Sequence, residues 1–194
     1  MIPGISGVIL AGGNSKRFNG ILKAKIIIKG KTIISRIIET IEDIFDEIII
    51  VTNIPEKFHE YTSCKIISDQ FCNKGPLGGI HAALKESERE AIFVIAGDMP
   101  NPDRNLIVRQ VNFYNNELCD VVIPQMDKFI EPLHGIYRKT ITRNLEDYLS
   151  HDNDYAVREF FKRTNVHYME LTVSEKANNP FININSPSDV GQAV

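Results

Sequence analysis

Apolar residues form two patterns along the chain, and the two patterns alternate. Short runs rich in Ile and Val are apolar on successive residues, which is typical of strands buried on both faces of a parallel sheet. The runs predicted as strands are 6–11, 47–52, 64–68, 91–96 and 120–124. Between the first two runs, Ile33, Ile37 and Ile41 stand at helical spacing within residues 32–45. That spacing predicts an amphipathic helix crossing from one strand to the next.

Later segments repeat the helical period and suggest how the chain closes. Helices are predicted at 79–87, 103–116, 139–149 and 155–163. Ser186, Pro187 and Asp189 supply an N-cap, a proline at the first helical position and an acid in the first turn of a short closing helix. Residues 131–139 are predicted as one more strand, with Pro132 suited to a sheet edge. Strands and helices in this order predict an open α/β sheet.

Composition narrows the class of protein without changing this picture. A chain of 194 residues with 43% hydrophobic and 24% charged residues fits one globular domain, 1–194. A net charge of -3 gives no general attraction to nucleic acid or anionic membranes, so any polyanion must bind locally. No apolar run approaches the roughly 20 residues that span a bilayer, and no signal peptide is evident.

The cysteines and histidines indicate no metal or disulfide framework. Cys64, Cys72 and Cys119 match neither disulfide nor metal-knuckle spacing, so we expect buried, reduced thiols in a cytoplasmic protein. The five histidines have no close metal-ligand spacing, and we expect most of them at the surface or in packing.

The first predicted strand ends in a glycine pair followed by basic residues. Gly12 and Gly13 let backbone amides approach a ligand closely, as phosphate cradles require. Arg17 and Lys23 follow in the same loop and could supply cations for a triphosphate. A glycine pair after a strand is also found in plain tight turns, so both interpretations stay open from this loop alone.

Two common phosphate-binding motifs are excluded. The residues GKT at 30–32 resemble the end of a P-loop, but Lys25 stands where that motif needs its first glycine. The dinucleotide pattern GxGxxG is absent after the first strand. Neither loop type holds a nucleotide here.

Further candidates follow other strands, where open α/β sheets bind their ligands. Asp69 precedes KGPLGG at 74–79, whose Gly75 and Gly79 could offer a backbone surface at a helix N-terminus. Asp98 follows the apolar strand 91–96 after one glycine, a position from which a carboxylate could hold Mg²⁺ together with phosphate oxygens. The alternatives are a rigid turn at 74–79 and a helix-capping role for Asp98.

Two asparagines near the end of the chain stand two residues apart. Asn183 and Asn185 lie in FININSP, and if this segment is a strand, both amides point to one face. They could contact a ligand, or they could bond neighbouring loops as structural amides.

Four motifs in order resemble a known family. LAGGNSKRFNGILK resembles the signature LAGGxSxRM-G-xDK of nucleotidyltransferases, and GPLGGI, GDMP and FININSP narrow the resemblance to molybdenum cofactor guanylyltransferases of the MobA type. The resemblance covers nearly the whole chain, and the sequence departs from it at Phe18, Asn19, Leu22 and Gly97. It implies a three-layer αβα, Rossmann-like fold of the nucleotide-diphospho-sugar transferase (glycosyltransferase-A-like) type with a mostly parallel central sheet.

The resemblance also implies roles for the candidate residues. Arg17, Lys23 and Asp98 would be catalytic, with Arg17 and Lys23 on the phosphates and Asp98 on Mg²⁺. The nucleotide would contact Leu10, Ala11, Gly12, Gly13, Lys23, Asp69 and Asp98. The acceptor or metal would lie near Gly75, Gly79, Asn183 and Asn185.

The implied reaction transfers GMP from GTP to the terminal phosphate of molybdopterin and releases pyrophosphate. Proteins that deliver molybdopterin or receive the product would be partners, whereas nucleic acid and membranes would not. The residues alone do not select guanine, so a sibling enzyme using CTP on molybdopterin or an NTP on a phosphosugar remains an alternative. A non-catalytic nucleotide-binding module is another.

Overall fold

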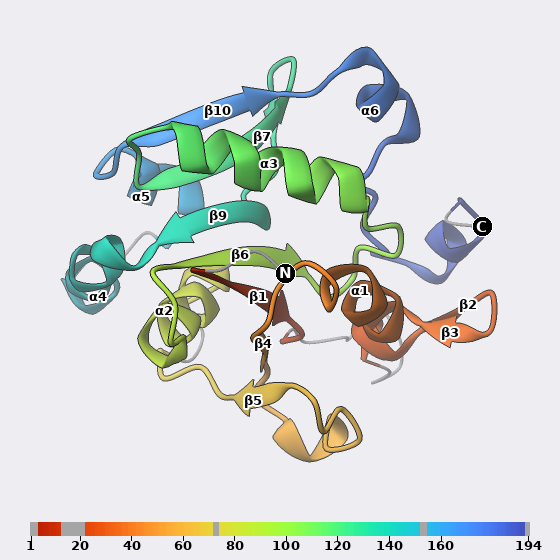
Figure 1. The fold of residues 1–194 in the computed structure, drawn as a ribbon. Helices are drawn as coiled ribbons and strands as arrows, with labels where there is room; N and C mark the ends of the chain where they lie inside the picture. The colour runs from red at the N-terminus through yellow and green to blue at the C-terminus, as the bar shows by residue number, and fades with distance from the viewer. Residues whose placement is uncertain (1–3, 13–21, 72–73, 152–154, 193–194) are drawn as a thin grey trace.

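A single mixed sheet organises the computed structural model, which describes residues 4–12, 22–71, 74–151 and 155–192. Its strand order is β10-β7-β9-β6-β1-β4-β5, and β8 pairs with β7 beside this path. The strands of this sheet are β1 (Ile5–Leu10), β4 (Ile48–Val51), β5 (Lys65–Ile67), β6 (Ala91–Ala96), β7 (Val121–Met126), β8 (Phe129–Ile130), β9 (His134–Arg138) and β10 (Val166–Glu170). Figure 1 shows this sheet running through the middle of the molecule.

Most neighbouring strands are parallel, as the apolar runs predict. β1 pairs in parallel with both β4 and β6, β4 with β5, and β10 with β7. β9 is antiparallel to both β6 and β7. The strand predicted at 131–139 forms as β9, but its expected edge position is wrong, because β9 lies inside the sheet and Pro132 belongs to the turn that precedes it.

Helices cover both faces of the sheet and form two apolar cores. One core includes residues of α1 (Ile33–Ile41) and α3 (Arg104–Asn116). The other includes residues of α2 (Pro76–Glu86), α4 (Thr142–His151) and α5 (Val157–Phe161). Strand residues alternate between the two cores, with Ile9 in the first and Val8 in the second. The predicted three-layer αβα architecture is confirmed.

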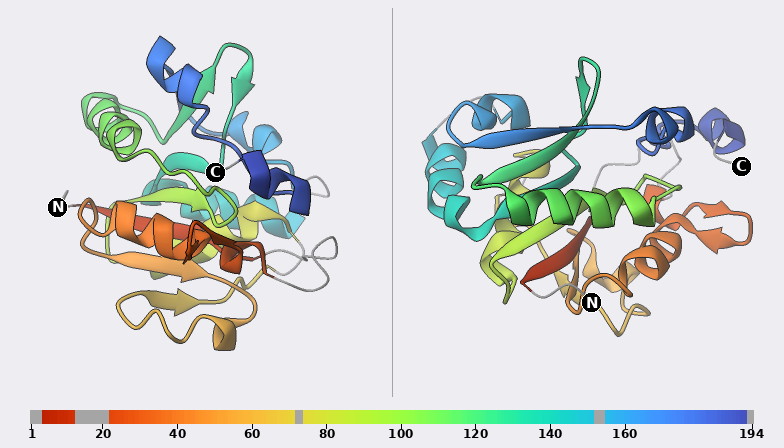
Figure 2. Two further views of the ribbon diagram at one scale, coloured as in Figure 1. Left: turned by 90° about the vertical axis from the view of Figure 1, so that its right-hand side faces the viewer. Right: turned by 45° about the horizontal axis from the view of Figure 1, so that its top comes forward.

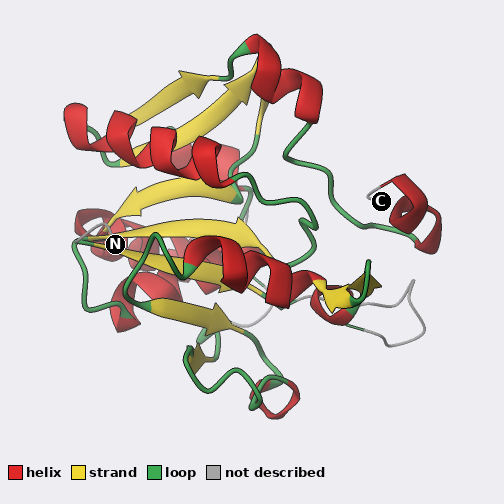
Figure 3. Cartoon of the chain, turned by 45° about the vertical axis from the view of Figure 1, so that its right-hand side comes forward, coloured by secondary structure: helices red, strands yellow, loops and turns green. Residues whose placement is uncertain are grey.

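Smaller elements surround these layers. A hairpin of β2 (Ile27–Ile28) and β3 (Lys31–Thr32) projects from the body beside α1 (Figure 2). The short 3₁₀ turns are η2 (Lys23–Lys25), η3 (Pro55–Lys57), η4 (Lys139–Ile141) and η5 (Pro187–Gln192). After α6 (Val173–Asn178), the chain runs as a loop to η5 (Figure 3). Among the described residues, no helix is long and apolar enough to cross a membrane.

The chemistry of local residues explains several of these boundaries. The Thr32 side chain accepts a hydrogen bond from the Ser35 amide, and the Asp103 side chain accepts from the amides of Asn105 and Leu106, so these residues cap α1 and α3. Asp189 likewise accepts from the amides of Asn185 and Ser186. The predicted closing helix forms, although as the 3₁₀ turn η5.

Buried polar side chains are consistent with the roles expected for histidine and cysteine. His134 is fully buried, and its Nδ1 lies 3.1 Å from Gln110 Oε1. Burial lowers the pKa of His134 to about 4, so it is a neutral packing residue. Cys119 is buried and Cys64 partly so, and burial raises the pKa of both thiols. Cys72 lies outside the described residues.

Gly7 in β1 is required by close packing against helix α1 and the turn that follows it. A Cβ atom at Gly7 would lie 2.9 Å from Phe45 Cδ2 and 3.0 Å from Ile41 Cδ1. The Phe45 ring has little room to retreat, because it is buried and stacks on Phe93 at a centroid distance of 5.5 Å. The small residue therefore lets α1 lie close to the central strand.

We predict that Gly7→Ala lowers the free energy of unfolding by about 1–3 kcal/mol through overpacking. Urea denaturation measures this change. Gly191→Ala is the matched control, because a Cβ atom there would meet nothing within 4 Å. Equal stability of the two variants would contradict the packing explanation.

Candidate functional site

Three predicted site residues meet at the carboxyl end of β6. The Lys23 Nζ donates to Asp98 Oδ2 at 2.9 Å and to Asn185 Oδ1 at 2.7 Å. The ion pair is partly buried, with 28% of the Lys23 side chain and 22% of the Asp98 side chain exposed. These residues are distant in sequence, and they bring a cation, a carboxylate and an amide to one point.

Backbone contacts hold the loops that carry these side chains. The amide of Gly97 donates to the Leu10 carbonyl at 3.0 Å, and the amide of Ile184 donates to the Asp98 carbonyl at 2.9 Å. A Cβ atom at Gly97 would lie 3.0 Å from the Leu10 oxygen, so glycine allows the ends of β1 and β6 to approach closely. The loop after β6 is thereby fixed between β1 and the C-terminal segment.

The two asparagines differ in environment, and the segment around them is not a strand. Residues 182–185 run as a loop beside Asp98, because they bond this loop through Ile184 and pair with no strand. Asn185 is exposed and accepts from Lys23. Asn183 Oδ1 is buried and has no hydrogen-bond partner in the described structure.

Asp69 lies against the first turns of α2. Its Oδ1 accepts from the Phe71 amide at 2.7 Å, and its own amide donates to Asn53 Oδ1 at 3.2 Å. Burial raises the pKa of the Asp69 carboxyl, and the Phe71 hydrogen bond opposes this shift. A Cβ atom at Gly78 would lie 2.5 Å from Asp69 Oδ2, so only glycine at this position leaves room for the carboxylate.

The other predicted glycines differ in their surroundings. Gly75 has φ +65° and ψ -159° and is the N-cap of α2, a backbone conformation that favours glycine. At Gly79, a Cβ atom would lie 3.1 Å from Leu10 Cδ2. Ala11 is buried, Leu10 is half-buried and Gly12 is exposed. Gly13 and Arg17 lie outside the described residues, so their roles stay predictions.

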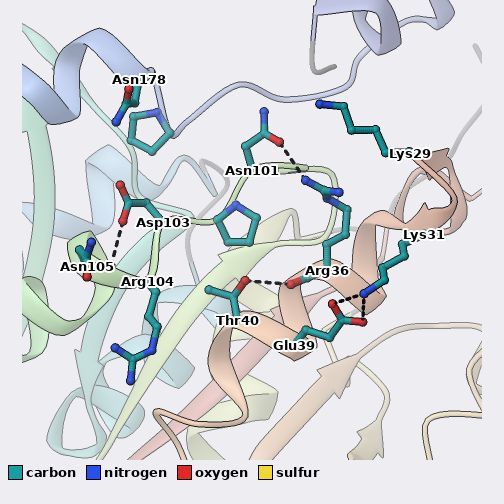
Figure 4. Close-up of a pocket in the computed structure, with 12 residues that line it drawn as sticks. Lys29, Lys31, Arg36, Glu39, Thr40, Asn101, Asp103, Arg104, Asn105 and Asn178 are labelled. Atoms are coloured by element: carbon teal, nitrogen blue, oxygen red, sulfur yellow. Dashed lines mark hydrogen bonds and ion pairs between the residues drawn. The ribbon is translucent and has the colours of Figure 1, made fainter.

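A separate groove of about 630 Å³ lies between α1, the β2–β3 hairpin and the start of α3 (Figure 4). Arg36 connects α1 to the loop after β6, because its Nε donates to the Pro100 carbonyl at 2.9 Å and its Nη2 to Asn101 Oδ1 at 3.4 Å. The predicted site residues do not line this groove. Three of them, Lys23, Asp98 and Asn185, meet at the ion pair instead, and Arg36 supports the loop that carries Asp98.

The sequence interpretation missed an acid at this edge of the sheet. Glu131 is 7% exposed, and burial, together with the charge of Asp98, raises its pKa against the opposing Leu133 hydrogen bond. In the sequence, Glu131 stands between apolar residues just before β9, and this position could have indicated a buried acid. The sequence pattern was interpreted only as part of the strand.

The fold and this cluster define an α/β protein with a cation–carboxylate site at the carboxyl edge of its sheet. The model of the MobA-like NTP transferase domain matches residues 7–168. The chain belongs to this family. A crystal structure of molybdopterin-guanine dinucleotide biosynthesis protein A from Archaeoglobus fulgidus superposes with a TM-score of 0.81 at 25% identity, covering 97% of this chain and 96% of that one.

Two curated relatives are similar over most of their length. A probable molybdenum cofactor guanylyltransferase of Natranaerobius thermophilus is 36% identical, with 100% of this chain and 96% of the relative covered. A protein of the same name in Peptoclostridium acidaminophilum is also 36% identical, with 96% and 87% covered. The family resemblance and the fold class expected from the motifs are confirmed.

We predict that Gly78→Ala weakens GTP binding on the order of tenfold, since the new methyl group would displace the Asp69 carboxylate, which the family resemblance implies to contact the nucleoside. Isothermal titration measures the dissociation constant. Asp69→Ala and the double variant complete a double-mutant cycle. If the effects of the two substitutions add fully, Gly78 does not act through Asp69.

Proposed function

We propose that this chain transfers GMP from GTP to the terminal phosphate of molybdopterin, forming the guanine dinucleotide cofactor and pyrophosphate. The observation that carries this proposal is the contact of Lys23, Asp98 and Asn185 at the sheet edge in a chain that belongs to the MobA-like family. The names of the full-length relatives support the same acceptor and nucleotide.

In the proposed reaction, a terminal phosphate oxygen of molybdopterin attacks the α-phosphorus of GTP. The bond from that phosphorus to the oxygen bridging to the β-phosphate breaks, and pyrophosphate leaves. No side chain needs to form a covalent intermediate. The protein therefore acts by positioning its substrates and by neutralising the charge that develops during transfer.

Lys23 is suited to neutralise phosphate charge. Its ammonium group now bonds Asp98 and Asn185, and it can exchange these acceptors for phosphate oxygens without leaving the site. Arg17 would assist it on the phosphates. Leu10, Ala11, Gly12 and Gly13 would line the nucleotide at the end of β1, with Asp69 on the nucleoside.

The oxygen donors around Asp98 fit a hard divalent cation. Nucleotidyltransferases of this family generally use a divalent metal ion, and we infer Mg²⁺ here. The Asp98 carboxylate and Asn183 Oδ1, which is buried and lacks a partner among the described residues, are ligand types that Mg²⁺ accepts. In the described residues, no group of three His, Cys, Asp or Glu could hold a metal, so substrate and water oxygens would complete the shell. When bound, the ion would stabilise negative charge on the phosphates.

The acceptor would approach from the side of α2 and the C-terminal segment. Gly75 and Gly79 lie at the start of α2, and Asn183 and Asn185 lie beside Asp98. Backbone at a helix N-terminus and side-chain amides are suitable partners for an anionic acceptor.

The proposal is tested by pyrophosphate release from GTP, CTP, ATP and UTP with Mg²⁺ and molybdopterin. We expect turnover with GTP alone, and a loss of a hundredfold or more in Asp98→Asn, typical of removing one charge-stabilising contact. Asp103→Asn is the matched control, since Asn also caps helices well and the loop keeps its fold.

Other results of this assay would contradict different parts of the proposal. Turnover with CTP would support the transfer mechanism but show that the enzyme uses cytosine instead of guanine. No turnover with any nucleotide would favour a non-catalytic nucleotide-binding module. Full activity of Asp98→Asn would exclude the assigned role of Asp98.

We further predict that Lys23→Gln raises the dissociation constant of GTP about tenfold or more, because a charge-assisted contact with phosphate is lost. The control is Lys25→Gln. Lys25 lies on the same 3₁₀ turn, but it pairs with Glu60 and lies over the rings of Phe58 and Tyr61. Equal GTP affinity of the two variants would contradict the role of Lys23.

A further inference from the structure

Glu131 is a buried acid without a cationic partner in contact. It is 7% exposed, and in the described part of the chain no lysine or arginine forms an ion pair with it. Its Oε1 accepts one hydrogen bond, from the Leu133 amide at 3.0 Å. Burying a carboxylate costs free energy unless a cation or several hydrogen bonds compensate it. One amide is little compensation.

Strand pairing brings Glu131 to the same sheet edge as Asp98. In the antiparallel pair of β6 and β9, Ile95 lies opposite His134, and the Ala96 amide donates to the Leu133 carbonyl at 2.9 Å. Asp98 follows Ala96 by two residues, and Glu131 precedes Leu133 by two. Both acids therefore lie just beyond the point where the ladder ends.

The electrostatics agree with this placement. Burial is the largest cause that raises the pKa of Glu131, and the negative charge of Asp98 raises it further. The Leu133 hydrogen bond and the charge of Arg158, on α5, lower it. The negative charges of Glu131 and Asp98 thus repel each other at the edge of the sheet. Lys23 bonds Asp98 and Asn185.

An independent feature of the same edge also lacks a partner. Asn183 Oδ1 is buried and has no hydrogen-bond partner among the residues that the structure describes, and the next residue, Ile184, bonds the Asp98 carbonyl through its amide. A divalent cation would satisfy both the excess negative charge and the unpartnered oxygen. Mg²⁺ sites in proteins commonly use one or two carboxylates together with waters and substrate phosphates.

We propose that Glu131 is the second carboxylate of the divalent-cation site at Asp98 and holds the ion before and during nucleotide binding. This inference rests on the proposed function, and it adds a residue from the loop before β9, whereas Asp98 lies in the loop after β6. A purely structural role, in which Glu131 only accepts the Leu133 amide and holds the turn before β9, is the competing explanation.

Glu131→Gln separates the two explanations, because glutamine keeps an oxygen for the Leu133 amide and removes only the charge. We expect the dissociation constant for Mn²⁺ alone, measured by electron paramagnetic resonance on the full chain, to rise about tenfold or more. In EDTA, the thermal midpoint should stay equal or rise, since a repelled buried charge is gone.

Two further variants serve as references for the change in Mn²⁺ affinity. Asp98→Asn should weaken Mn²⁺ binding in the same assay. Glu47→Gln should not, because Glu47 lies just before β4 at the opposite end of the sheet, where its carboxylate accepts from Ser6 and the Glu88 amide. A weaker Mn²⁺ affinity in Glu131→Gln without loss of thermal stability would support the metal role.

Unchanged Mn²⁺ affinity in Glu131→Gln, or no Mn²⁺ binding by the unaltered protein, would overturn the inference. A lower thermal midpoint in EDTA together with unchanged affinity would establish the structural role instead. GMP transfer by the unaltered protein is measured in parallel. If transfer occurs while Glu131→Gln binds Mn²⁺ normally, only the role of Glu131 is wrong; if no transfer occurs, the proposed function fails by itself.

Discussion

The pairing of β1 with two parallel neighbours is the constraint on which the site depends. β4 and β6 bond β1 on its two sides, and the buried residues Val8 and Ile9 face opposite cores. Parallel strands end at the same edge, so the carboxyl ends of β1 and β6 lie together there (Figure 1). The Gly97 amide bonding the Leu10 carbonyl is the direct result.

At the carboxyl edge of the sheet, interactions between charged side chains matter more than apolar packing. Lys23 neutralises part of the charge of Asp98, while Glu131 remains buried beside it with one backbone donor. The two carboxylates are unfavourable for each other, and a bound divalent cation would offset their repulsion. This agrees with the proposed cation site in a chain of the MobA-like NTP transferase family.

Elements with a clear apolar pattern were predictable, including the edge strand β5 within its predicted run 64–68, and elements without such a pattern were not. β6 matches its predicted range, 91–96, because all six of its residues are buried and apolar. β10 was missed, because an edge strand with exposed Tyr168 lacks a continuous apolar run. α6 was also missed, because it buries no residue and therefore shows no apolar period. The capping box of Thr172 and Glu175 stabilises its start.

The sequence by itself determined the α/β class, the main strands and the motifs that indicate the family, since these depend on local periodicity and short-range spacing. Tertiary structure alone decided that β9 lies inside the sheet, that Lys23 meets both Asp98 and Asn185, and that Glu131 joins the edge where Asp98 lies. The reason is that strand order and contacts between distant loops depend on how the layers pack, and no local pattern of residues records that packing.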